Sequence, residues 1–169
     1  MKKVVLLTIA VAMAFTMQSQ HVFTKGLLMF NAGIGIPHSN GFIPSVNFSG
    51  EYGVIPTGSI GLVSFGGLAE FQMGQHSWGT DNELFPKFYV GARAAWHVHA
   101  FNSDIFDAYA GAGFGVAISG KTDHYSSNTQ INPDIFVGGR WMFSPGMGLF
   151  AELGYTGLSS VKFGLTFGL

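Results

Sequence analysis

After its first 25 residues, the sequence returns repeatedly to long segments in which every second side chain is apolar. The alternation is clearest over residues 44–54, where Val46 and Phe48 take one parity and Ser45 and Glu51 take the other. A period of two places alternate side chains on opposite faces of a strand. The segments are about as long as the 9–11 residues that a tilted strand needs to cross a bilayer. The pattern therefore predicts a transmembrane β-barrel.

The composition agrees with a membrane wall and excludes several other classes of protein. Charged residues make up 10% of the chain, against roughly 25% in soluble domains, and hydrophobic residues make up 47%. The net charge of −1 leaves neither a basic face for nucleic acid nor an acidic tail. The chain has no cysteine, so disulfides, thiolate metal sites and a lipid-modified N-terminal cysteine are excluded.

The first 20 residues differ from the rest. Lys2 and Lys3 precede an apolar run that ends at Phe15, and a polar stretch follows. This order is that of a secretory signal peptide, and the run is too short for a spanning helix. We place the cleavage between about residues 14 and 21. Export combined with an alternating apolar pattern predicts the outer membrane of a diderm bacterium.

The alternation divides the mature region, residues 21–169, into eight segments, which predict an all-β, antiparallel, up-and-down barrel of one domain. Short turns at one end and longer loops at the other are characteristic of such barrels. The longest predicted outer loops are 75–86 and 120–132. An even number of strands places both mature termini in the periplasm. The predicted strands cover residues 26–36, 44–54, 59–74, 87–99, 105–119, 133–144, 148–157 and 161–169.

The charged residues give a partly independent test of which face of each strand points outward. Apolar residues alone set the parities, yet every charged strand residue takes the opposite, inward parity. On the lipid face, an Arg or Lys near the midplane would cost roughly 2–4 kcal/mol. A soluble antiparallel sandwich also alternates, but it would carry far more Lys and Glu on its water-facing side. The inward charged residues are Glu51, Glu70, Lys87, Arg93, Asp107, Asp134, Arg140, Glu152 and Lys162.

Seven of these side chains predict a charge network inside the barrel. Unpaired buried charges are costly, so complementary signs are expected to meet. An eight-stranded barrel has an interior just wide enough to be filled by side chains. The network therefore predicts a structural plug, and the alternative is a narrow, gated ion-conducting pore. The predicted acids are Glu51, Glu70, Asp107 and Glu152, the bases are Arg93, Arg140 and Lys162, and Tyr109, His97 and Gln72 extend the hydrogen bonding.

The end of the chain carries a second pattern. Lys162, Gly164, Phe167 and Leu169 fit a polar-x-Gly-x-x-apolar-x-apolar sequence. This resembles the β-signal that the outer-membrane assembly machinery recognises on a last strand, although Leu169 stands where many such proteins end in Phe or Trp. The resemblance implies that this machinery is a partner.

In architecture and pattern, the whole mature region resembles the small eight-stranded outer-membrane barrels, the family that includes OmpX and the membrane domain of OmpA. The resemblance implies an interior filled by side chains. We interpret the sequence as that of a monomer without enzymatic activity, in contact with outer-membrane lipids and lipopolysaccharide. The expected role is structural, or an interaction with the surroundings through the extracellular loops.

One short motif offers an enzymatic alternative. The sequence His124-Tyr125-Ser126 resembles that of the outer-membrane lipid A deacylases, in which such a Ser attacks an acyl ester after the His removes its proton. A carboxylate beside the His at the lipid face is required, whereas Asp134 and Glu152 have inward parity. About three strands also follow His124, more than in that family. We therefore predict no catalytic residues and keep the deacylase as an alternative.

Other candidate sites have simpler explanations. His97 and His99 share an inward face, but two ligands are too few for a convincing zinc site. The glycine runs at 33–35 and 111–115 are not G-x-G-x-x-G and open no helix. We predict neither a metal nor a cofactor.

Overall fold

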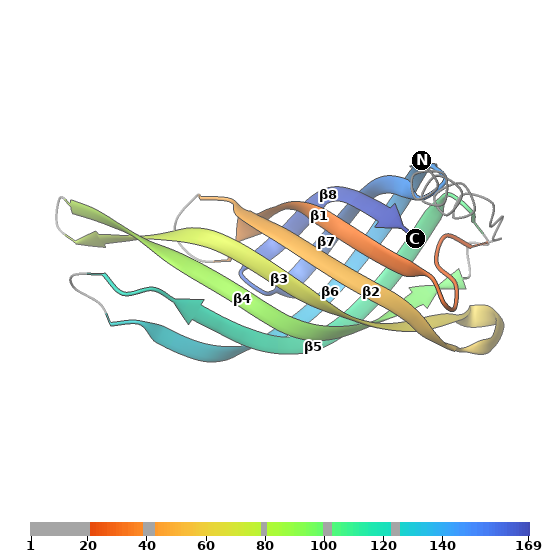
Figure 1. The fold of residues 1–169 in the computed structure, drawn as a ribbon, viewed down its shortest axis with the longest axis horizontal. Helices are drawn as coiled ribbons and strands as arrows, with labels where there is room; N and C mark the ends of the chain where they lie inside the picture. The colour runs from red at the N-terminus through yellow and green to blue at the C-terminus, as the bar shows by residue number, and fades with distance from the viewer. Residues whose placement is uncertain (1–20, 39–42, 79–80, 100–102, 123–125) are drawn as a thin grey trace, which may run out of the picture.

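The computed structural model describes residues 21–38, 43–78, 81–99, 103–122 and 126–169, and the structural statements below concern these residues. They form a closed barrel of eight strands in sequence order (Figure 1). The elements are β1 (Leu28–Pro37), β2 (Ser45–Pro56), the short 3-10 helix η1 (Gly58–Ile60), β3 (Gly61–Trp78), β4 (Asp81–Val98), β5 (Phe106–Ser119), β6 (Asn128–Ser144), β7 (Met147–Thr156) and β8 (Ser159–Gly168).

The predicted fold class, an antiparallel up-and-down β-barrel of eight strands, is confirmed. Each strand pairs antiparallel with the next, and β1 pairs with β8 to close the barrel, for example at Ile34 opposite Phe163. Closure leaves no unpaired sheet edge along the wall, which is the usual solution to the edge-strand problem.

Two of the predicted loops are wrong in part, because strands extend into them. The register of β3 and β4 continues to Trp78 opposite Asp81, through most of the predicted loop 75–86. Similarly, β6 begins at Asn128, inside the predicted loop 120–132. Beyond a lipid-facing wall a hairpin needs only its backbone hydrogen bonds, so its sequence need not alternate. The alternation therefore reports the apolar wall and misses the strand ends.

The side chains divide as the parities predict. Large apolar residues lie exposed on the outer surface, with exposed fractions of 63% for Val46 and 66% for Val90 and Phe114. Polar residues of the other parity, such as Asn31 and Ser45, are completely buried in the interior. In a soluble protein an apolar surface of this extent would be an aggregation liability.

The two ends of the barrel differ. We call the end with η1, the β6–β7 turn and the C-terminus the turn end, and the opposite end the loop end. In Figure 1 the β3–β4 and β5–β6 hairpins extend furthest at the loop end, so this rim is uneven. Among the described residues, no helix has the length and apolarity required to cross a membrane.

Candidate functional site

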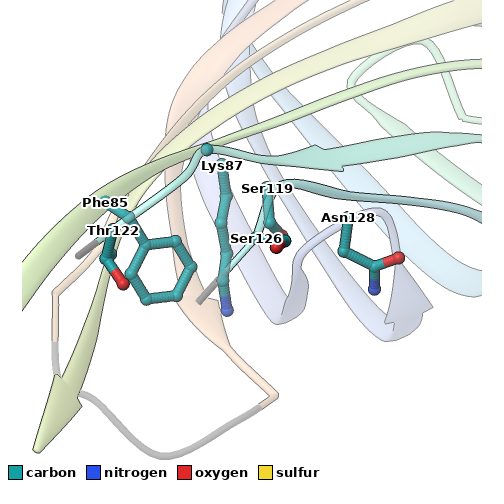
Figure 2. Close-up of a pocket in the computed structure, with 7 residues that line it drawn as sticks. Phe85, Lys87, Ser119, Thr122, Ser126 and Asn128 are labelled. Atoms are coloured by element: carbon teal, nitrogen blue, oxygen red, sulfur yellow. The ribbon is translucent and has the colours of Figure 1, made fainter. Parts of the chain in front are cut away.

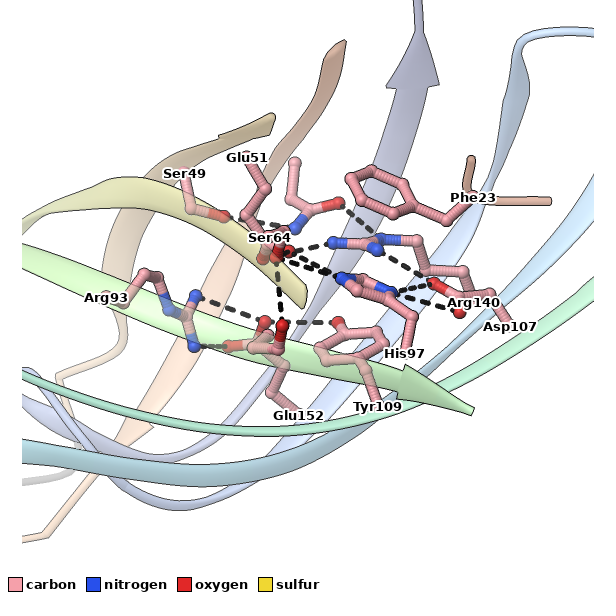
Figure 3. Close-up of polar contacts among 12 residues, drawn as sticks. Phe23, Ser49, Glu51, Ser64, Arg93, His97, Asp107, Tyr109, Arg140 and Glu152 are labelled. Carbon is pink, nitrogen blue, oxygen red and sulfur yellow. Dashed lines mark hydrogen bonds and ion pairs between the residues drawn. The ribbon is translucent and has the colours of Figure 1, made fainter. Parts of the chain in front are cut away.

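The interior at the turn end is organised around Arg140, whose side chain is fully buried. Its Nη1 donates to Asp107 Oδ2 at 2.9 Å, and its Nη2 donates to Glu51 Oε1 at 3.2 Å. Its Nε donates to Asn31 Oδ1 at 3.3 Å. Asp107 lies opposite Arg140 in the β5–β6 register, and Glu51 comes from β2 across the barrel (Figure 3). Asn31 comes from β1. One guanidinium therefore connects four strands.

His97 joins the same cluster from β4. Its Nδ1 lies 3.0 Å from Asp107 Oδ2, and its Nε2 lies 3.2 Å from Glu51 Oε2 and 3.0 Å from Ser64 Oγ. A ring protonated on both nitrogens donates to both carboxylates. The imidazole is completely buried, so its partners are these protein groups.

The segment before β1 enters the turn end and closes over this cluster. The ring of Phe23 stacks on His97 with 4.0 Å between centroids and is 1% exposed. The backbone of the segment is held by His99 Nε2, 3.0 Å from Phe23 O, and by Gly26 N, which donates to Gly53 O at 2.9 Å. Figure 3 shows Phe23 beside Arg140 and His97. Sequence reasoning missed this contact, because residues 21–27 have no alternation.

A second cluster lies midway along the barrel around Arg93. Its Nη1 and Nη2 donate to the two oxygens of Glu152 at 3.2 and 3.0 Å, a bidentate pair. Its Nε lies 3.3 Å from Asp134 Oδ2, and its guanidinium lies 3.5 Å from the centroid of the Phe136 ring. Tyr109 donates to Glu152 Oε1 at 3.1 Å, which links this cluster to the Arg140 cluster.

A third cluster fills the loop end around Glu70 and Lys162. Lys162 Nζ lies 3.0 Å from Glu70 Oε2 and donates to Thr156 O and Oγ1 at 2.6 and 2.7 Å. Glu70 also accepts hydrogen bonds from Ser45 Oγ at 2.5 Å, from Ser159 Oγ, and from the backbone of Leu158 at 2.8 Å. The carboxylate thus ties β3 to β2 and to the β7–β8 turn.

The structure brings all seven residues of the predicted network into ion pairs, in the three clusters above. Asp134 adds an eighth charge through Arg93, whereas Gln72 donates to the backbone of Ile43 and lies outside the clusters. Inward parity alone would have found several buried polar residues that sequence reasoning omitted. Among them are Asn31, Ser45, Ser64, Thr156 and Thr166.

The remaining candidate residues are placed as follows. His124 lies outside the described residues, as does the predicted signal peptide. Ser126 is exposed and lines a pocket at the loop end whose described lining contains no carboxylate. Within the described ranges, no group of three or more His, Cys, Asp or Glu side chains could hold a metal ion.

The terminal pattern lies on β8, between β1 and β7, and ends at Leu169, one residue beyond the strand. Lys162 points into the interior, while Phe167 stands opposite Phe30 on β1. The backbone of Leu169 exchanges two hydrogen bonds with Leu28, at 2.8 and 3.2 Å. The last residues therefore belong to the seam that closes the barrel.

A His–Ser pair that sequence reasoning missed lies on the outer side of the loop end. His38 Nδ1 is 3.0 Å from Ser160 Oγ, its Nε2 is 3.3 Å from Gly157 O, and its ring stacks on Tyr155 at 4.0 Å. Burial lowers the pKa of His38, and the hydrogen bond to Gly157 opposes this only in part. The pair ties the end of β1 to the β7–β8 turn across 122 residues of sequence.

The fold and interior define a small, closed, eight-stranded barrel of the outer-membrane type. The crystal structure of Ail, the attachment invasion locus protein of Yersinia pestis, has the same fold: the TM-score is 0.51 at 14% identity, covering 86% of this chain and 100% of Ail. Ail in complex with the heparin analogue sucrose octasulfate gives a TM-score of 0.46 at 13% identity, with the same coverage. No protein-family model and no curated protein matches the chain. The expected resemblance to the small eight-stranded barrels is thus confirmed for the fold.

Proposed function

We propose that the protein is an integral outer-membrane barrel whose interior is filled by its own side chains and which acts at the cell surface through its loop end. The observation that carries this proposal is the contrast between wall and interior. Exposed apolar side chains cover the outside, and the buried ion pairs lie within. Such an inside-out arrangement is stable when lipid, and not water, surrounds the wall.

The interior favours a plug over the narrow pore. Arg93 and Arg140 are each bound to two carboxylates and are at most 3% exposed. A permeating ion would have to displace these partners. At the turn end, Phe23 adds an apolar ring over the Arg140 cluster. Both features oppose a continuous water-filled path.

The same proposal includes the export of the protein and its assembly into the outer membrane. Residues 1–20 would be removed as a signal peptide during export. The pattern of Lys162, Gly164, Phe167 and Leu169 would be read by the outer-membrane assembly machinery before β8 closes against β1. Because the closed barrel satisfies its own strand edges, the protein would stand as a monomer among outer-membrane lipids and lipopolysaccharide.

Four measurements test the proposal and its alternatives. Cell fractionation and a detergent gel should show an outer-membrane protein that migrates differently before and after boiling. The folded protein should give no stable conductance in a planar bilayer, whereas Phe23→Ala combined with Arg93→Ala should produce brief openings. Stable conductance of the wild type would overturn the plug, and identical migration before and after boiling would overturn the barrel. Unchanged lipid A mass on expression would count against the deacylase, whereas a change abolished by Ser126→Ala would establish it.

A further inference from the structure

A pocket opens at the loop end between β4, β5 and β6, with a volume of about 250 Å³ (Figure 2). Its polar floor is one transverse row of the sheet. Lys87 stands opposite Ser119 in the β4–β5 register, and Ser119 stands opposite Asn128 in the β5–β6 register. Three adjacent strands therefore present an ammonium, a hydroxyl and a carboxamide side by side.

The pocket owes its space to a glycine on the neighbouring strand. A Cβ at Gly74 of β3 would lie 2.6 Å from Phe85 Cζ and 2.9 Å from Lys87 Cε. Without it, the Phe85 ring and the Lys87 chain can lie against β3. In Figure 2 the Phe85 ring stands on one side of Lys87, and Ser119 and Asn128 stand on the other.

Lys87 differs from the other inward bases. Arg93, Arg140 and Lys162 each have a carboxylate within 3.3 Å. Among the described residues, no carboxylate lies within ion-pair distance of Lys87, and its Nζ lies 5.2 Å from the centroid of the Phe85 ring. A half-buried cation that faces a pocket and lacks a fixed anion is suited to binding an anion from outside.

The rest of the lining indicates what the anion is attached to. Thr122 and Ser126 add two hydroxyls to that of Ser119, and Phe85, which is 6% exposed, closes one side of the pocket. Hydroxyls and an amide match the hydrogen bonds of a sugar. The volume is below the roughly 300–1,000 Å³ of pockets for drug-sized molecules, which restricts the ligand to about one sugar ring.

We propose that this pocket binds a single phosphorylated sugar unit, with the phosphate on Lys87 and the sugar hydroxyls on the polar side chains of the lining. Lysine is a common phosphate ligand that acts as a point charge. The inference rests on the proposed function insofar as the loop end must face the cell exterior to meet such a sugar. The sugar could belong to a glycolipid of the outer leaflet or to a soluble glycan.

Calorimetric titration of the refolded wild-type barrel with glucose 6-phosphate, glucose and inorganic phosphate tests the site. Glucose 6-phosphate should bind at least about tenfold more tightly than either of the other two. Lys87→Met should weaken its binding roughly 10- to 100-fold, the usual range for a lost hydrogen bond to a charged group. Lys121→Met, an exposed lysine next to the pocket, is the matched control and should bind as the wild type does.

Asn128→Asp provides a second variant that leaves Lys87 in place. Asn128 is exposed, so the barrel should fold, and the added negative charge should repel the phosphate. The proposal is overturned if glucose 6-phosphate does not bind, if inorganic phosphate binds as tightly, or if Lys121→Met weakens binding as much as Lys87→Met does.

Lipopolysaccharide in bicelles separates the two sources of the sugar. Competition with glucose 6-phosphate assigns the pocket to the glycolipid, and unchanged affinity assigns it to a soluble glycan. Heat-modifiable migration of each sample verifies the barrel independently. A folded barrel that binds glucose 6-phosphate but is absent from the outer membrane would overturn the proposed location and leave the pocket intact.

Discussion

Arg140 connects four strands through its hydrogen bonds, and its replacement tests how far the interior charges stabilise the barrel. The guanidinium binds Asp107 and Glu51, which are 4% and 1% exposed. In Arg140→Met a chain of similar length remains, but both carboxylates lose a partner that water cannot replace. Removing one partner from a buried ion pair typically costs about 3–5 kcal/mol. The folding equilibrium constant should therefore fall by roughly two to nearly four orders of magnitude.

Equilibrium unfolding in urea, followed by tryptophan fluorescence of the barrel in lipid vesicles, measures this loss. Lys121→Met removes an exposed positive charge and should change stability by less than about 0.5 kcal/mol. A triple variant with Arg140→Met, Glu51→Gln and Asp107→Asn should be more stable than Arg140→Met alone, because the unpaired charges cause most of the cost. A loss below about 1 kcal/mol, or a triple variant no more stable than the single one, would refute this reasoning.

Three further predictions concern the outer face of the barrel, the packing of a glycine against Tyr109, and the dependence of stability on pH. Val137→Arg places a charge on the outer face and should cost roughly 2–4 kcal/mol in the urea assay, whereas Val137→Leu should be nearly neutral; equal effects would contradict a lipid-facing wall. In Gly138→Ala, the new Cβ would lie 2.6–2.8 Å from atoms of the Tyr109 side chain. We expect about 1–3 kcal/mol of destabilisation, and Tyr109→Ala should remove most of this cost in a double-mutant cycle. Burial lowers the pKa of His38 in the folded protein. As the pH falls below about 6.5, His38 is therefore protonated in the unfolded chain before it is protonated in the folded one, which lowers the stability of the folded state. The stability difference between wild type and His38→Gln should therefore shrink between pH 7 and 5, and a difference that grew would contradict the direction of the shift.

The sequence was sufficient for the wall because the period of a strand is fixed by the backbone. Once Val46 and Phe48 face outward, Asn47 and Glu51 must face inward, whatever the rest of the barrel does. The same argument placed all eight strands. It failed at Trp78, Asp81 and Asn128, where strands continue beyond the apolar wall and their side chains no longer need to alternate.

The pairing inside the barrel could not be predicted in the same way. Glu152 and Lys162 stand opposite each other in the β7–β8 register, which makes them the obvious pair. Instead, Glu152 binds Arg93 from β4, and Lys162 binds Glu70 from β3. These contacts cross the interior, so they depend on how the closed barrel tilts its strands and on the length of each side chain. Parity determines which residues meet the interior, but not which partners they find.

The crossing contacts explain why so charge-poor a chain places its charges inside. Backbone hydrogen bonds connect only neighbouring strands, whereas the Arg140 cluster joins β1, β2, β5 and β6 directly. These side-chain contacts across the interior stabilise the closed cross-section of the barrel against flattening. Backbone hydrogen bonds between neighbouring strands do not prevent flattening. Charged side chains that are paired inside the barrel are not available to bind a ligand. Lys87 is the inward base without a described carboxylate partner, and it lies in the loop-end pocket. The ammonium group of Lys87 therefore lies where a ligand from outside the barrel can reach it.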